Sequence, residues 1–178
     1  LNHVDFKFVV EELIALHKRD IKIGVSVYDV SQVFESYNVF KFDMVQIPLN
    51  PLDQRFNTKE FIEFTKYNNV EVHVRSVFLQ GLLLMGVNEI PSYFAPWLSV
   101  IKSYHQELNK QKQSLLAAAL QFVFALHEVD KVVVGVNSLS QLQEVIAALE
   151  SPPIAIDYSQ FALTDVKILN PSFWPNRS

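Results

Sequence analysis

The chain has 178 residues, of which 49% are hydrophobic and 12% aromatic, and its formal charge is −4. This apolar content excludes a disordered chain, and the length predicts one domain with a sizeable core. Because it has no cysteine, the chain has no disulfide, thiolate zinc site or cysteine nucleophile. The acidic balance and the lack of a Lys/Arg run argue against nucleic acid as a partner.

Membrane and metal partners are not expected either. The sequence has no run of ~18 apolar residues, the length that a membrane span needs. Ionisable residues between His3 and Glu12 stand where a signal peptide would be apolar. No pair of histidines has the spacing of metal ligands. We therefore expect a cytoplasmic protein without a metal site.

Helices and strands are predicted to alternate along the chain. Apolar residues at helical spacing predict helices over 5–19, 31–36, 59–67, 96–108, 111–128 and 139–149. Short apolar runs predict strands over 21–27, 42–49, 70–77 and 131–136. Strands separated by helices predict a parallel sheet covered by helices, and the run of three valines at 132–134 predicts full burial of the last strand. The hydroxyls of Ser31, Ser138 and Ser140 are predicted to cap helix N-termini.

The third predicted strand shows which face of the sheet is polar. Alternation places Val70, Val72 and Val74 on one face and Glu71, His73 and Arg75 on the other. Three ionisable residues under a helical layer would be costly, whereas the lumen of a (β/α)8 barrel has room for them near its active site. We therefore predict half of such a barrel, with a flavodoxin-like open sheet as the alternative. His73 is expected to be buried and hydrogen-bonded to Glu71 or to a carbonyl.

Four segments, in this order, resemble the second half of an aldo/keto reductase. They are IGVSVY at 23–28, FDMVQIPLNPLDQR at 42–55, VRSVFLQGLLL at 74–84 and KVVVGVNSLSQLQEV at 131–145. They resemble strands five to eight of that family's barrel and the loops that follow. The resemblance implies that residues 1–178 form one domain, an incomplete TIM (β/α)8 barrel, with a tail over 150–178 that packs on the body.

The resemblance also implies a nicotinamide cofactor, NADP or NAD, and a small carbonyl substrate. Nine positions match cofactor-binding positions of the family: Ser26, Gln46, Arg75, Ser76, Phe78, Gln80, Ser138, Gln141 and Glu144. The first two match contacts to the nicotinamide carboxamide, and Arg75 stands where a ring commonly stacks on the nicotinamide. The next three match the pyrophosphate loop, and the last three match residues around the adenosine phosphate and adenine.

This sequence departs from the family pattern at three cofactor positions. Asn137 stands where many NADPH-dependent members carry Lys or Arg, so the charged partner for a 2′-phosphate is missing. Val27 and Val145 each replace an asparagine that is frequent in the family. The charge of Arg75 is expected to disfavour the oxidised, cationic nicotinamide. These departures favour the use of NADH or weak cofactor binding.

The family's catalytic Asp, Tyr, Lys and His have no match in this chain, because the resemblance places them in the first half of the barrel. The tyrosine donates the proton in that family. The chain is also shorter than the ~200 residues that a barrel needs, and its first residue is Leu1. We therefore expect that it begins midway through a parent oxidoreductase that reduces an aldehyde or ketone, and that it is inactive alone. The alternative is a non-catalytic binding or regulatory module.

The fragment interpretation predicts an oligomer. Four parallel strands leave two unpaired edges, at 21–27 and 131–136, and exposed edges recruit partners. A chain of this length is therefore expected either to form a homo-oligomer, a dimer that completes a barrel-like sheet, or to aggregate.

Overall fold

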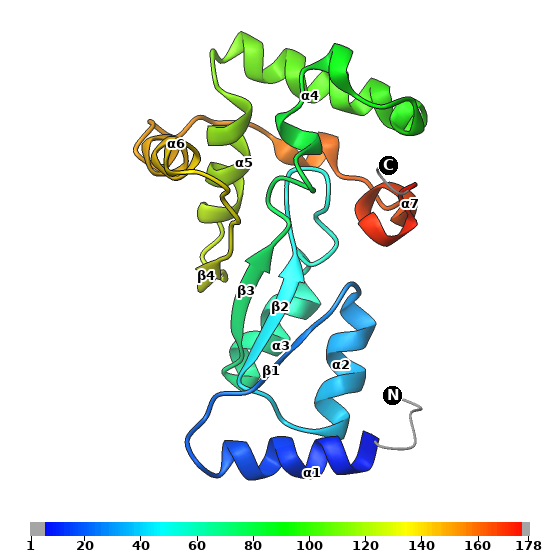
Figure 1. Ribbon diagram of the computed structural model, residues 1–178, viewed down its shortest axis with the longest axis vertical. Helices are drawn as coiled ribbons and strands as arrows, with labels where there is room; N and C mark the ends of the chain where they lie inside the picture. Colours follow the sequence, from blue (N-terminus) through cyan, green and yellow to red (C-terminus); the bar gives the residue numbers. More distant parts are fainter. Residues whose placement is uncertain (1–5, 176–178) are drawn as a thin grey trace.

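The computed structural model describes residues 6–175 and contains one sheet of four parallel strands in the order β1-β2-β3-β4 (Figure 1). The strands are β1 (Gly24–Ser26), β2 (Met44–Pro48), β3 (Glu71–Arg75) and β4 (Lys131–Val132). The α-helices are α1 (Phe6–His17), α2 (Val30–Val39), α3 (Lys59–Asn68), α4 (Leu98–Lys110), α5 (Leu115–Phe124), α6 (Leu139–Leu149) and α7 (Val166–Leu169). Short 3-10 helices cover Leu82–Leu84, Val87–Glu89, Ser92–Trp97, Tyr158–Phe161 and Pro171–Phe173. The predicted α/β class, a parallel sheet with outer helices, is confirmed.

The helices cover one face of the sheet. The residues of β2 and β3 that face the helices are buried: Val45, Ile47, Val72 and Val74. They share one core with buried residues of the surrounding helices, among them Val33 of α2, Phe61 of α3, Leu120 of α5 and Val145 of α6. The alternate residues of β3 are polar and half-buried, as the alternation predicted. The flavodoxin-like alternative, which needs helices on both faces, is therefore wrong.

A second core lies beyond the carboxyl ends of the strands, where α4 and α7 sit in Figure 1. It contains Leu79, Leu82 and Leu83 from the segment after β3, together with Ile101 and Tyr104 of α4. The tail contributes Phe161, Ile168 and Leu169, which are all buried, whereas Phe173 is exposed. The indole N–H of Trp174 donates to the Ile168 carbonyl at 3.0 Å.

The loop after β2 joins this second core to the sheet. The side chain of Asp53 is buried and accepts two hydrogen bonds from Arg55, from Nε and Nη2, each at 2.8 Å. The side-chain amide of Gln54 donates to the Tyr158 carbonyl at 2.7 Å, across 104 positions of sequence. These polar residues therefore hold the tail against the sheet.

Both edge strands are shorter than predicted. Only two residues of the predicted strand 131–136 pair with β3, and Val133 is 49% exposed. The expected full burial of the valine run is therefore wrong, because within residues 6–175 no further strand covers this edge. The predicted strand 21–27 pairs only over Gly24–Ser26, since Ile21 still bonds to the end of α1 through the Leu16 carbonyl. The predicted start of the first helix, at residue 5, lies outside the described residues.

One of the three predicted helix caps is confirmed. Ser138 caps α6 by accepting a hydrogen bond from the Gln141 N–H at 3.2 Å. Ser31 does not cap α2, because Asp29 holds that position and accepts from the Ser31 N–H at 2.9 Å. A carboxylate is favoured there by the positive end of the helix dipole. Ser140 lies inside α6, where its hydroxyl contacts that of Ser138.

Candidate functional site

The carboxyl ends of the strands bring together the first two predicted cofactor residues. Ser26 ends β1 and pairs in register with Gln46 of β2. The Ser26 hydroxyl donates to the Gln46 side-chain oxygen at 3.2 Å. Both residues lie on the sheet face that the helices leave open. The predicted proximity is thus confirmed, while the role of the pair stays a prediction.

Arg75 ends β3 and reaches across to the loop after β1. Its guanidinium donates to the Val27 carbonyl at 3.1 Å and to the Ser76 hydroxyl at 3.2 Å. The same group lies over the Tyr28 ring, 4.3 Å from the ring centre. The cation therefore already stacks on a ring of this chain. Sequence reasoning missed this contact because Tyr28 and Arg75 are 47 positions apart. The only signal was that both lie near the carboxyl end of a predicted strand.

A groove of about 840 Å³ opens beside Arg75, at the carboxyl ends of β3 and β4. We call it the carboxyl-end groove. Its wall includes six of the nine predicted residues: Arg75, Ser76, Phe78, Gln80, Gln141 and Glu144. Asn137 and Val145, two positions where this sequence departs from the family pattern, also line the wall. The remaining wall residues are Val77, Gly81, Leu84, Leu115, Leu116, Val133, Val134, Gly135 and Val136. Ser26, Gln46 and Ser138 lie outside this wall.

The loop that forms one side of the groove has an unusual backbone. Ser76, Leu79 and Gln80 have positive φ angles between 45° and 60°, which non-glycine residues adopt rarely. Two buried anchors hold it. Asn50 donates from its side-chain amide to the Ser76 carbonyl at 3.1 Å, and Leu79 is fully buried in the second core. Such strain persists only where the surroundings fix the conformation, and it is common at ligand sites.

The N-terminus of α6 forms the opposite side of the groove. Ser138 caps the helix, and the Gln141 side-chain oxygen accepts from the Asn137 N–H at 2.8 Å. Gln141 therefore bonds both to the N-cap Ser138 and to the residue before it, which fixes where the helix begins. Glu144 follows one turn later and also lines the wall. The charged residues of the wall are therefore Arg75 near the sheet and Glu144 on α6.

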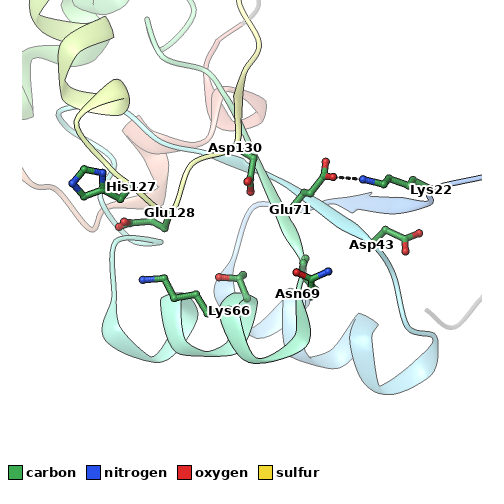
Figure 2. Close-up of a pocket in the computed structure, with 10 residues that line it drawn as sticks. Lys22, Asp43, Lys66, Asn69, Glu71, His127, Glu128 and Asp130 are labelled. Carbon is green, nitrogen blue, oxygen red and sulfur yellow. Dashed lines mark hydrogen bonds and ion pairs between the residues drawn. The ribbon is translucent and has the colours of Figure 1, made fainter.

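A second hollow, of about 490 Å³, lies at the other ends of the strands (Figure 2). We call it the amino-end pocket. It is lined by Lys22, Asp43, Thr65, Lys66, Asn69, Val70, Glu71, His127, Glu128 and Asp130. Among the residues that the structure describes, no group of three His, Asp or Glu side chains is arranged to hold a metal ion.

The acidic residues of the amino-end pocket hold the strands. Asp43 accepts from the Ile23 N–H at 2.8 Å, and Asp130 accepts from the Val72 N–H at 2.7 Å. Each aspartate thus extends the hydrogen-bond ladder of a strand pair by one step. Because these carboxylates already accept hydrogen bonds from backbone N–H groups, the carboxyl-end groove is the better candidate for a ligand site.

Glu71 contacts two lysines and a histidine at the edge of the amino-end pocket. Its carboxylate is hydrogen-bonded to Lys22 and, at 3.2 Å, to His73, and Lys131 lies 3.6 Å away. The hydrogen bonds from Lys22 and then His73 lower the pKa of Glu71 to about 2. The expected bond between His73 and Glu71 is confirmed, so His73 has a structural role.

Four parallel strands with helices on one face, and a groove at their carboxyl ends, define a part of a (β/α)8 barrel. The model of the Aldo/keto reductase family matches residues 20–165. The chain therefore belongs to the aldo/keto reductase family. A search of curated proteins found no match.

Similar solved structures are aldo-keto reductases. The apo form of AKR11C1 from Bacillus halodurans aligns with a TM-score of 0.67 and 19% identity over 90% of this chain and 56% of that chain. Its holo form gives 0.62 and 20% over 85% and 53%. A thermostable aldo-keto reductase, Tm1743, in complex with the inhibitor epalrestat gives 0.57 and 15% over 85% and 51%. The chain thus spans about half the length of the structures that it matches.

No helix within residues 6–175 combines the length and the apolar character needed to cross a membrane.

Proposed function

We propose that this chain is the cofactor-binding half of an NAD(P)H-dependent oxidoreductase that reduces an aldehyde or ketone. The observation that carries the proposal is the convergence of six predicted cofactor residues on the carboxyl-end groove. When bound, the nicotinamide cofactor would supply the hydride. In this proposal the family's catalytic Asp, Tyr, Lys and His have no counterpart in the chain, which supplies no proton donor.

The shape of the groove supports a bound ligand. Gly81 and Gly135 both line it, and a Cβ built on either would meet no atom within 4 Å. Each glycine therefore leaves open space that the protein itself does not fill. A groove of this size also has the scale of ligand sites, about 300–1,000 Å³. The residues present fit an extended dinucleotide.

The groove wall and three residues outside it, Ser26, Gln46 and Ser138, have proposed tasks. The Ser26 hydroxyl and the Gln46 amide, held side by side, would orient the nicotinamide carboxamide. The loop 76–81 would wrap the pyrophosphate. Ser138, Gln141 and Glu144 would hold the adenosine, and the capped N-terminus of α6 favours a phosphate there. Asn137 offers no cation to a 2′-phosphate, so NADH is the favoured cofactor over NADPH.

The test is a titration of the 178-residue chain with NADH and with NADPH, in which binding is measured by the quenching of tryptophan fluorescence. We expect saturable binding that is tighter for NADH. Gly135→Val should weaken it at least tenfold, because the new side chain would occupy open space in the groove. Its far-UV spectrum and unfolding midpoint should match those of the wild type. Absence of binding by a folded chain would refute the proposal. Robust carbonyl reduction by the chain alone would refute the statement that the chain supplies no proton donor.

A non-catalytic binding or regulatory module is the second candidate, and Val27 favours it. This residue is buried, its N–H donates to the Gln46 carbonyl, and its carbonyl accepts from Arg75. It therefore offers a cofactor no polar group. Under this alternative, neither NADH nor NADPH binds to the folded chain.

A further inference from the structure

Tyr28 is a large aromatic residue that belongs to neither core of the molecule. It lies in the loop after β1, is 40% exposed, and is not among the side chains that pack in or on the two cores. Two other tyrosines differ in this respect, since Tyr37 packs on the core between sheet and helices and Tyr104 lies in the second core. Core packing therefore does not explain the ring of Tyr28.

The named contact of this ring is the guanidinium of Arg75, whose central carbon lies 4.3 Å from the ring centre. The backbone that carries the ring is fixed on both sides. The Tyr28 N–H donates to the side-chain oxygen of Gln32 at 2.9 Å. The next residue, Asp29, is the N-cap of α2. The start of α2 therefore presents the ring to Arg75 in a defined position.

Three contacts hold the guanidinium, and they come from different directions. Its two terminal nitrogens donate to the Ser76 hydroxyl and the Val27 carbonyl. Hydrogen bonds of a guanidinium lie in its plane, whereas the Tyr28 ring lies over its face. Arg75 nevertheless lines the carboxyl-end groove, so these contacts do not close it off from a ligand.

The charge of Arg75 is held without being neutralised. Other cations near the sheet are paired with carboxylates, namely Arg55 with Asp53, and Lys22 and Lys131 with Glu71. Within residues 6–175, Arg75 forms no such ion pair; its partners are a carbonyl, a hydroxyl and a ring. An aromatic face attracts a cation through its quadrupole and carries no net charge. Tyr28 therefore fixes Arg75 while leaving a full positive charge at the groove.

We propose that Tyr28 is a positioning residue that holds the Arg75 cation beside the nicotinamide and thereby sets the preference for the reduced cofactor. The inference rests on the proposed function, because it takes the nicotinamide to bind beside Arg75. A fixed cation repels the positively charged ring of NAD⁺ and leaves the neutral ring of NADH unaffected. Without the Tyr28 ring, the guanidinium can turn toward water, where solvent screens its charge.

The first test compares Tyr28→Leu with Tyr28→Phe by titrating the 178-residue chain with NADH and with NAD⁺. Tyr28→Leu should raise the affinity for NAD⁺ relative to NADH at least ~3-fold, whereas Tyr28→Phe keeps the ring and should change this ratio less than ~2-fold. Tyr67→Leu, at a residue of α3 that is 90% exposed, is the control and should leave the ratio unchanged. The unfolding midpoints should match that of the wild type, because Tyr28 lies outside both cores.

The outcomes separate the two proposals. A folded wild-type chain that binds neither form would refute the proposed function itself. Binding with the same ratio in Tyr28→Leu and wild type would overturn only the role of Tyr28. In an Arg75→Met background, Tyr28→Leu should leave the ratio unchanged, because the two residues act through one contact. A further rise of the ratio there would show that Tyr28 acts independently of Arg75.

The second test needs no cofactor. In the ligand-free chain, the ring current of Tyr28 should shift the NMR signal of the Arg75 Nε–H. Tyr28→Leu should move this signal toward that of an unstacked arginine, and Tyr28→Phe should leave it nearly in place. A signal that does not move in Tyr28→Leu would show that the ring does not hold the guanidinium, and the inference would fall.

Discussion

The guanidinium of Arg75 lies 4.3 Å from the centre of the Tyr28 ring and donates to the Val27 carbonyl. These contacts tie the end of β3 to the loop after β1 across the open face of the sheet. A planar cation held in this way is already stacked before any ligand arrives. Tyr28 thus helps to fix the position of Arg75, which lines the sheet end of the carboxyl-end groove.

Arg75→Met should change how the chain distinguishes the two oxidation states of the cofactor. The wild-type charge disfavours a cationic ring nearby, so its removal should raise the affinity for NAD⁺ relative to NADH several-fold. Parallel titrations with the two forms measure this ratio. Arg19→Met, at the exposed end of α1, is the control and should leave the ratio unchanged. An unchanged ratio in Arg75→Met would place the nicotinamide away from Arg75.

Asn50→Ala should destabilise the loop that lines the groove. The side chain of Asn50 is fully buried, donates to the Ser76 carbonyl and accepts from the N–H groups of Leu52 and Asp53. Its loss leaves buried backbone groups without partners, each at about 1–3 kcal/mol. Urea unfolding should therefore show a loss of at least ~1 kcal/mol. Asn38→Ala, on the exposed side of α2, should stay within ~0.5 kcal/mol of the wild type.

Ser138→Ala should lower the stability of the chain more than Ser140→Ala, because only Ser138 caps a helix. Ser138 accepts from the Gln141 N–H, so its loss should cost about 1 kcal/mol of unfolding free energy. Ser140 lies within α6 and bonds no backbone group, so its replacement should have little effect. Equal effects of the two substitutions in urea unfolding would contradict the capping role of Ser138.

Phe161→Ala tests how the tail stabilises the fold. Phe161 is buried in the second core, where its ring packs edge-on against Tyr104. Truncation of such a ring costs about 3–5 kcal/mol. Phe173→Ala removes an exposed ring from the same tail and should cost much less. Thermal unfolding of both variants measures the difference, and similar midpoints would show that the tail does not contribute to the core.

Glu71→Gln should flatten the acid dependence of stability. The pKa of Glu71 is about 2 in the folded chain, below its ordinary 4.5, because Lys22 and then His73 hydrogen-bond its carboxylate. A lowered pKa gives stability that is complete above pH 4.5 and is lost as the pH falls toward 2. The difference in unfolding free energy between wild type and Glu71→Gln should therefore shrink over that range. Glu63→Gln, an exposed residue of α3, should show no such trend.

Several features of the fold follow from local sequence patterns. The alternation of valine with Glu71, His73 and Arg75 predicted both faces of β3, because a strand repeats every two residues regardless of its neighbours. The family resemblance implied that Ser26 and Gln46 contact the same carboxamide, and the register of β1 and β2 makes them adjacent. Four motifs in order predicted the family. These patterns involve residues that are close in sequence, so they can be recognised without knowing how the chain packs.

Other features depend on contacts between distant segments. The length of β4 could not be read from its valines, because it depends on the neighbouring strands, and in the described part of the chain β4 pairs with β3 alone. The role of Asn50 in the loop after β3, and the bond from Gln54 to Tyr158, join residues 26 and 104 positions apart. Nothing local marks either residue as an anchor.

The sequence alone thus determined the order of the elements, the polar face of the sheet and the family, because periodicity and motif order are properties of neighbouring residues. Only the tertiary structure decided which predicted residues share the groove, where Arg75 is held and which surfaces remain uncovered. Those outcomes depend on how loops and helices pack across the sheet, and packing is settled by the burial and hydrogen bonding of the whole chain at once.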